Sequence, residues 1–140
     1  IALASEKAPD AIVDVATLTG AQVIALADTA AVMGNDEALR ARVVAAADLA
    51  GEAMWPMPLP RELRPALDSP NADLAHKGGR EGGMLTAGLF LGEFVGGGIP
   101  WSHIDIAGPA FTDKAARGYD SKGGTGFGVR TLVALAESYA

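Results

Sequence analysis

The run from Ala11 to Thr19 (AIVDVATLT) is almost continuously apolar and rich in β-branched side chains, and Gly20 closes it. A strand with one wet face alternates polar and apolar residues, whereas a strand covered on both faces is an unbroken apolar run. The run therefore predicts a strand in a parallel sheet that helices cover on both sides. Trp101 to Gly108 (WSHIDIAG) predicts a second strand, and Ala30 to Gly34 a third.

The segment that follows Ala30–Gly34 predicts a well-defined helix. Asn35 or Asp36 can cap its start, and Gly51 supplies the residue that ends it. Between them, apolar residues recur with the 3.6-residue period of a helix. This stripe consists of Leu39, Val43, Ala46, Ala47 and Ala50.

Weaker helical patterns cover 21–27, 61–67 and about Met84 to Val95, and a closing helix begins near Phe127. Trp55 to Pro60 (WPMPLP) has a proline at every second position, which predicts an extended loop that joins no central strand. Strands that alternate with helices predict an α/β layered fold. The residues expected on the inner face of the closing helix are Val129, Leu132, Val133, Leu135 and Ala136.

Composition excludes several classes of function. The chain has no cysteine, which excludes disulfide scaffolds, thiol catalysis and cysteine-based zinc sites. Lys and Arg number 11 against 17 Asp and Glu, so a net charge of −6 disfavours binding to nucleic acid or anionic membranes. No apolar run approaches the ~20 residues that a membrane-spanning helix needs. We expect a soluble, cytoplasmic protein without a nucleic-acid or membrane partner.

The first residues suggest an interrupted helix. Ile1 to Ala8 has a helical composition but no capping residue before it, and Pro9 ends the pattern. We expect this chain to be the C-terminal part of a longer protein. An engineered chain boundary is the alternative interpretation.

Few side chains are candidates for chemistry. His103 and Asp105 lie two apart on a predicted strand and therefore project from the same face, where they could bind a metal or act as base and orienter. Two ligands make an incomplete site, so the favoured interpretation is a buried pair that hydrogen-bonds mutually. Asp14, in mid-strand, needs a donor and is also expected to be structural. His76 lies in a polar loop, where solvation is favoured.

Glycine-rich segments do not form a nucleotide-binding motif. Lys114 to Gly126 predicts a polar loop, and Gly123 to Gly128 leads into the closing helix. That pattern does not match G-x-G-x-x-G, and neither a phosphate loop nor a G-x-S-x-G elbow is present. Taken alone, the residues form no complete catalytic constellation.

Two short segments follow the predicted strands at their carboxyl ends. Thr17 to Gly20 follows the first strand, and Ala107 to Ala110 follows the later one. Open α/β sheets place ligands at this edge, and small residues allow a substrate to approach the backbone amides. Close packing of small residues is an equally weighted alternative.

Four separated motifs occur in this order: Val13–Ala21 (VDVATLTGA); Asp73–Arg80 (DLAHKGGR) with Gly82, Gly83, Thr86, Ala87, Phe90 and Leu91; Trp101–Gly108; and Lys122–Gly126 (KGGTG) with Val129, Arg130 and Leu132. Together they resemble the leucyl (cytosol) aminopeptidase family over the whole chain. The resemblance implies a three-layer α/β/α fold around a mixed, mainly parallel sheet (phosphorylase/hydrolase-like), incomplete here. It implies that residues 1–140 are the C-terminal part of the catalytic domain.

The family resemblance also implies a metal-dependent exopeptidase with two divalent ions (Mn, Zn or Mg), and a bicarbonate held by an arginine. The ligands and catalytic residues lie in earlier family motifs, including an Asn-Thr-Asp-Ala-Glu-Gly-Arg signature that this sequence lacks. The resemblance therefore gives this chain no catalytic residue and no metal ligand, and His103 and Asp105 match strand residues that are not ligands. Family members assemble as hexamers, so a homo-oligomer is expected.

The residues that carry over are those of a substrate pocket. Thr17 and Gly20 match positions that line it, and the backbone of Leu18 matches a contact to substrate or bicarbonate. Ala107 and Ala110 match its floor, which receives the N-terminal side chain. Because Ala110 is smaller than the Met of some members, the resemblance implies a wider pocket here.

Two functions follow from this resemblance. The first is a metalloexopeptidase that releases N-terminal amino acids from peptides, active as a full-length parent and inactive as the isolated segment. The alternative is a noncatalytic binding or oligomerisation module of the same fold. A nucleotide-binding domain is disfavoured because the chain has no phosphate loop.

Overall fold

The computed structural model describes residues 1–140 and places a four-stranded sheet at its centre. The strand order is β1 (Ile12–Ala16), β4 (Trp101–Asp105), β2 (Ala30–Gly34) and β3 (Met54–Pro56). β1 pairs with β4 in parallel and β2 with β3 in parallel, whereas β2 and β4 run antiparallel. The sheet is therefore mixed and mainly parallel, as the family resemblance implies.

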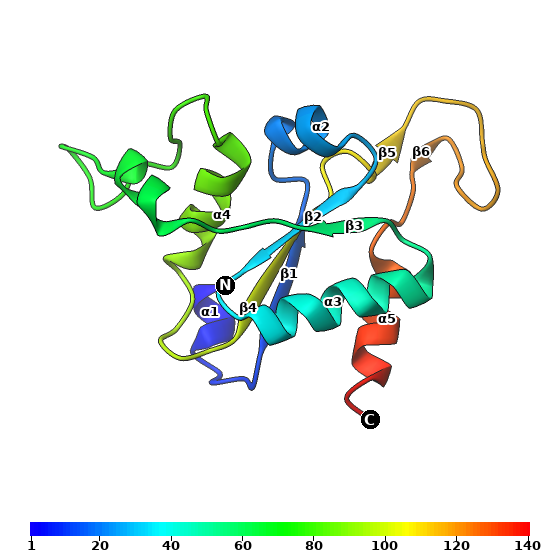
Figure 1. Ribbon diagram of the computed structural model, residues 1–140, viewed down its shortest axis with the longest axis horizontal. Coiled ribbons are helices and arrows are strands. Elements are labelled where there is room, and N and C mark those ends of the chain that lie inside the picture. Colours follow the sequence, from blue (N-terminus) through cyan, green and yellow to red (C-terminus); the bar gives the residue numbers. More distant parts are fainter.

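Helices cover both faces of this sheet, which confirms the three-layer α/β/α architecture. On one face α3 (Glu37–Ala50) and α5 (Val129–Glu137) pack over a core that includes Val32 and Ile104. On the other face lie α2 (Gly20–Leu26) and α4 (Gly83–Gly92), where Met84 of α4 belongs to one buried cluster with Ala31 and Met33 of β2. Figure 1 shows these two pairs of helices on opposite sides of the strands.

The helix α3 forms where its sequence predicts because its signals are local. The Asp36 carboxylate accepts a hydrogen bond of 2.7 Å from the Leu39 amide and caps the helix. Gly51 ends it with a φ of +68°, a left-handed conformation that favours glycine. Asn35 has a different role, because its side-chain oxygen accepts a hydrogen bond from the Trp101 amide at 2.7 Å.

Both predicted strands around the site are longer than the observed ones. β1 ends at Ala16 and β4 ends at Asp105, so the segments 17–19 and 106–108 leave the sheet. The extended segment after α3 contains the short strand β3, which sits at the edge of the sheet. The prediction that this segment joins no central strand is wrong, because β3 pairs in parallel with the inner strand β2. The proline is tolerated because β3 itself lies at the edge of the sheet.

The inner face of α5 differs from the prediction. Of the five residues expected there, only Leu135 is buried, while Val129 and Val133 are 60% and 54% exposed. Thr131 is buried instead, because its amide and its hydroxyl both donate to the Glu52 carboxylate, at 2.9 and 2.6 Å. This contact from a distant part of the chain sets the rotation of the helix.

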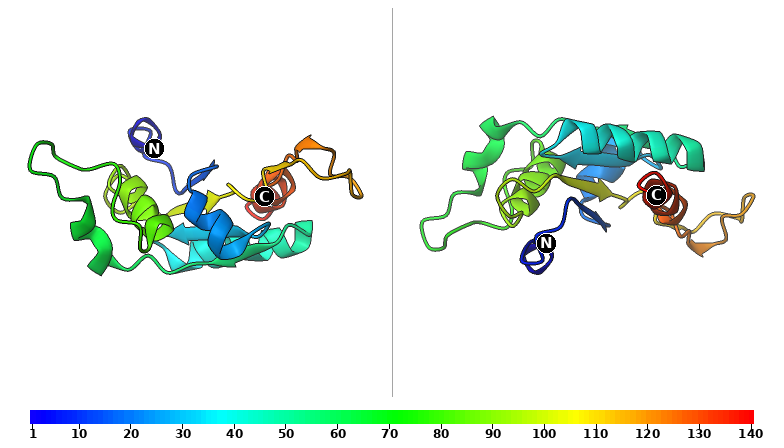
Figure 2. Two further views of the ribbon diagram at one scale, coloured as in Figure 1. Left: turned by 90° about the horizontal axis from the view of Figure 1, so that it is seen from above. Right: turned by 90° about the horizontal axis from the view of Figure 1, so that it is seen from below.

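The remaining elements are short. α1 (Ala2–Ser5) precedes β1, and the 3₁₀ helix η1 (Arg61–Leu67) precedes α4. β5 (Phe111–Thr112) and β6 (Gly123–Gly124) form a small antiparallel pair inside the region predicted as a polar loop. Figure 2 shows this hairpin and the loop before α4 extending from opposite ends of the molecule. No helix has both the length and the apolar character needed to cross a membrane.

Candidate functional site

The carboxyl ends of β1 and β4 lie side by side and define the candidate site. The two strands are parallel, and Ala16 is directly opposite Asp105. The segment that begins at Thr17 leaves one strand, and the segment that begins at Ile106 leaves the other. Parallel pairing therefore brings together two of the segments that the sequence predicts to bind a ligand.

A single buried carboxylate joins the two segments. Asp105 is fully buried, and its Oδ1 accepts hydrogen bonds from the Leu18 amide at 3.0 Å and the Ala107 amide at 3.2 Å. Its Oδ2 accepts a hydrogen bond from the Thr19 hydroxyl at 2.8 Å. A buried carboxylate needs such donors, and here the donors come from both segments.

A buried amide side chain makes a second connection. Gln22 Oε1 accepts a hydrogen bond of 2.6 Å from the Gly108 amide, and Nε2 donates to the Thr29 carbonyl at 2.6 Å. The backbone N–H of Gln22 in turn donates a hydrogen bond of 3.0 Å to the Thr19 hydroxyl. Gln22 is not among the predicted site residues, although an amide side chain within the apolar, alanine-rich segment 21–27 is a signal for a buried polar contact.

Glycine is required at position 108 by the close approach of two loops. A Cβ atom placed there would lie 1.8 Å from the Ala27 carbonyl oxygen, which no side chain can tolerate. The end of α2 therefore packs directly against the segment that follows β4.

The five predicted substrate-binding residues all lie at or near this end of the sheet. Thr17 and Gly20 are exposed, whereas Leu18, Ala107 and Ala110 are half-buried. Ala110 lies on a turn, and its carbonyl accepts a hydrogen bond of 3.0 Å from the Thr125 amide. The geometry thus groups four of these residues around the Asp105 carboxylate and places Ala110 just beyond them.

His103 and Asp105 do not hydrogen-bond to each other, so the expected mutual pair is wrong. His103 Nδ1 lies 2.6 Å from Asp14 Oδ1, and Trp101 Nε1 donates to Asp14 Oδ2 at 2.6 Å. The need of Asp14 for a donor is confirmed. His103 is fully buried, and its Nε2 has no hydrogen-bond partner. His76 is exposed, as expected.

The side chains of these residues do not fit a dinuclear metal site. The structure brings together no group of three or more His, Cys, Asp or Glu residues able to hold a metal ion. Asp105 already accepts three hydrogen bonds, and Asp14 accepts one from Trp101 besides its contact with His103. We therefore assign no metal ligand within residues 1–140.

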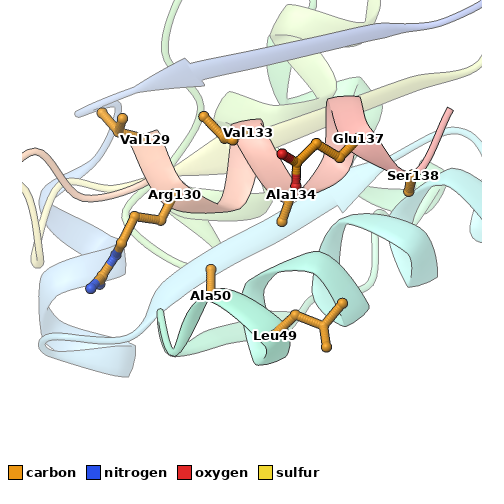
Figure 3. Close-up of a pocket in the computed structure, with 8 residues that line it drawn as sticks. All are labelled: Leu49, Ala50, Val129, Arg130, Val133, Ala134, Glu137 and Ser138. Atoms are coloured by element: carbon orange, nitrogen blue, oxygen red, sulfur yellow. The ribbon is translucent and has the colours of Figure 1, made fainter. Parts of the chain in front are cut away.

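Two surface cavities lie away from these segments. One, of about 570 Å³, lies between the ends of α3 and α5 (Figure 3). Its lining includes Leu49, Val133 and Arg130. The other, of about 580 Å³, is lined in part by Arg61, Arg64 and Trp101. The hydrogen bond from Arg64 to Glu93 raises the pKa of this guanidinium, which is charged in proteins in any case.

Comparison with known proteins gives a consistent result. Residues 1–133 match the cytosol aminopeptidase family, catalytic domain. A probable cytosol aminopeptidase of Streptomyces avermitilis is 63% identical over 135 residues, which are 96% of this chain and 26% of the relative. One from Streptomyces griseus is 62% identical over 138 residues, 98% of this chain and 27% of the relative. The chain spans about a quarter of the length of these curated relatives.

Solved structures show the same similarity. The bottromycin maturation enzyme BotP superposes with a TM-score of 0.94 at 42% identity, over 99% of this chain and 31% of that one. The same enzyme has been solved in complex with Mn, and there the TM-score is 0.93. A mutant tomato leucine aminopeptidase gives a TM-score of 0.89 at 36% identity, over 96% of this chain and 26% of that one.

Proposed function

This chain belongs to the cytosol aminopeptidase family, and from that membership we propose that a full-length protein containing it is a metalloexopeptidase. It releases N-terminal amino acids from peptides. In this proposal residues 1–140 are the C-terminal part of the catalytic domain and contribute walls of the substrate site. The full-length protein works in the cytoplasm as a homo-oligomer. The family resemblance implies that this oligomer is a hexamer.

The observation that supports this role is the joining of two loops at the carboxyl ends of adjacent parallel strands. Thr17, Leu18 and Gly20 belong to the first loop, and Ala107 to the second. Their backbone groups and small side chains suit contacts with a peptide backbone. We propose that these residues bind substrate, and that Ala107 and Ala110 form the floor of the pocket for the N-terminal side chain.

The two divalent ions of the proposal, Mn, Zn or Mg, are held by residues outside this chain. The side chains present here do not fit such a site, so we assign no step of hydrolysis to them. The Mn complex of BotP supports the metal dependence of the family to which the chain belongs. A bicarbonate ion near the Leu18 backbone is a further part of the proposal.

The decisive experiment compares the 140-residue chain with a full-length protein in hydrolysis of leucine amide, with Mn²⁺ or Zn²⁺ added. We expect turnover by the full-length protein and none by the shorter chain, since the latter holds no metal site. Turnover by the shorter chain would contradict the assignment. A full-length protein that assembles and binds peptides without hydrolysing them would favour the alternative, a noncatalytic binding or oligomerisation module.

A further inference from the structure

We propose that Asp105 is a positioning residue, which fixes the two substrate-binding loops relative to each other and sets the affinity for substrate. The inference rests on the proposed function, because it concerns the same loops. Asp105 is fully buried, and three donors within the chain occupy its carboxylate. It therefore acts through the loops and does not itself touch the substrate.

The orientation of one peptide group follows directly from this contact. The N–H and C=O of a trans peptide unit point in opposite directions. Because the Leu18 amide donates to Asp105, the Thr17 carbonyl in the same peptide unit points away from that carboxylate. This carbonyl accepts no hydrogen bond from the chain, and Thr17 is exposed. The contact leaves an acceptor open to a ligand at this edge of the sheet.

The second loop depends on the same oxygen atom. Asp105 Oδ1 accepts from both Leu18 and Ala107, so neither amide can turn without breaking a bond to the shared carboxylate. Gln22 adds a parallel connection, from Thr19 on the first loop to Gly108 on the second. The wall and the floor of the proposed pocket are thus held as one unit.

The two acceptor oxygens at this position matter as well as the shape of the side chain. Both carboxylate oxygens accept hydrogen bonds, whereas an asparagine would present an NH₂ group in place of one of them. If that NH₂ faced Thr19, the hydroxyl would lose its acceptor. Asp105→Asn keeps the volume but removes at least one of the bonds, and Asp105→Ala removes all three.

The test is a kinetic comparison of variants in the metal-loaded full-length protein. Asp105→Asn is expected to raise KM for leucine amide about tenfold, the effect of losing a hydrogen bond to a charged group, with metal content and kcat largely retained. Ser102→Ala is the matched control, because Ser102 is fully buried on the same strand and projects from the face opposite to Asp105. Its hydroxyl donates to the Met33 carbonyl of β2. Its KM is expected to stay unchanged.

A second pair of variants, at Thr19, tests the same contact if the Asp105 variants do not fold. Thr19→Val removes the hydroxyl that donates to Asp105, and Thr19→Ser restores it. We expect a raised KM for the valine variant and recovery for the serine variant.

The outcomes separate the two proposals. Variants that lose folded, metal-loaded protein but keep the KM of the unsubstituted enzyme would show that Asp105 is only structural, and would overturn this inference alone. An unsubstituted full-length protein without any turnover would overturn the proposed function and this inference with it.

Discussion

At the scale of single residues, Asp14 shows how a half-buried carboxylate is accommodated in this sheet. It lies in the middle of β1, and its two oxygens contact His103 and Trp101 of the neighbouring strand. The sequence predicts that Asp14 needs a donor, because an unpaired carboxylate in mid-strand is costly. It does not identify the donor, since that depends on which strand lies beside β1.

The same point explains the wrong pairing expected for His103 and Asp105. Residues two apart on a strand lie about 6.5–7 Å apart, whereas directly opposed residues on adjacent strands are about 5 Å apart. Asp14 is directly opposite His103, so it is the nearer partner. The sequence places His103 and Asp105 on one face correctly but cannot show that a closer carboxylate lies beside them.

Substitution of His103 by alanine tests this buried cluster. We expect His103→Ala to lower the free energy of unfolding by about 1–3 kcal/mol, because Asp14 loses a hydrogen-bond partner next to a new cavity. Urea denaturation of the full-length protein measures the change. A variant that melts like the unsubstituted protein but loses peptidase activity would show that His103 has a functional role.

Substitution of Ala110 tests the proposal that this residue forms part of the pocket floor. Ala110→Met adds volume at a half-buried turn, so we expect the full-length protein to disfavour large N-terminal side chains by about tenfold, with stability nearly unchanged. The measurement is kcat/KM for a set of aminoacyl amides that differ only in side-chain size. Loss of the folded state would show that Ala110 is a packing position.

At the scale of secondary-structure elements, the sequence predicts best where the signals are local. The cap, the stripe and the terminal glycine of α3 lie within the helix or next to it, and its predicted bounds agree with the structure. α5 differs because Glu52, which orients it, is 76 positions from Gly128 in the sequence. No periodicity within α5 contains that information.

Glu52 provides a specific test of this explanation. It is 3% exposed, and its carboxylate accepts hydrogen bonds from the Gly128 amide and from the amide and hydroxyl of Thr131. We expect Glu52→Ala to destabilise the chain by roughly 3 kcal/mol, because amides at the start of α5 lose their acceptor inside the protein.

Amide hydrogen exchange in the same variant tests the cause. Protection is expected to fall in α5 more than in α3, and Glu37→Ala, which removes an exposed partner of Arg40, is the control with little effect. Equal loss of protection in both helices would contradict a specific anchoring role for Glu52.

At the scale of the whole molecule, the layered α/β fold and the family follow from the sequence, but the strand order does not. β2 lies beside β4 and runs against it, a contact between segments far apart in the chain. The alternation of strands and helices predicts parallel neighbours, and only tertiary packing determines where an antiparallel pair enters. The loops that meet at the candidate site are therefore predicted individually, while their connection through Asp105 is not.

The surface of the whole chain predicts self-association. β1 is an edge strand of the sheet, and Val129 and Val133 are exposed on α5. In Figure 3 these two side chains project away from α3. An open strand edge and exposed apolar side chains are each features of surfaces at which chains associate.

Sedimentation velocity on the purified 140-residue chain measures this association. We expect the average mass to rise with concentration, and Val133→Lys to reduce the rise by placing a charge on the exposed face of α5. Leu3→Lys, a change at an apolar residue on α1 that is more exposed than Val133, is the control and should have little effect. A chain that stays monomeric at all concentrations would contradict the expectation.

The crowding at Gly108 has a consequence for directed evolution of substrate range. A library that randomises the residues after β4 would be almost entirely lost at this codon, because the Ala27 carbonyl occupies the space of any side chain. Diversity directed to Ala107 and Ala110 avoids that barrier. Selected clones with altered preference should then carry new residues on either side of an unchanged glycine.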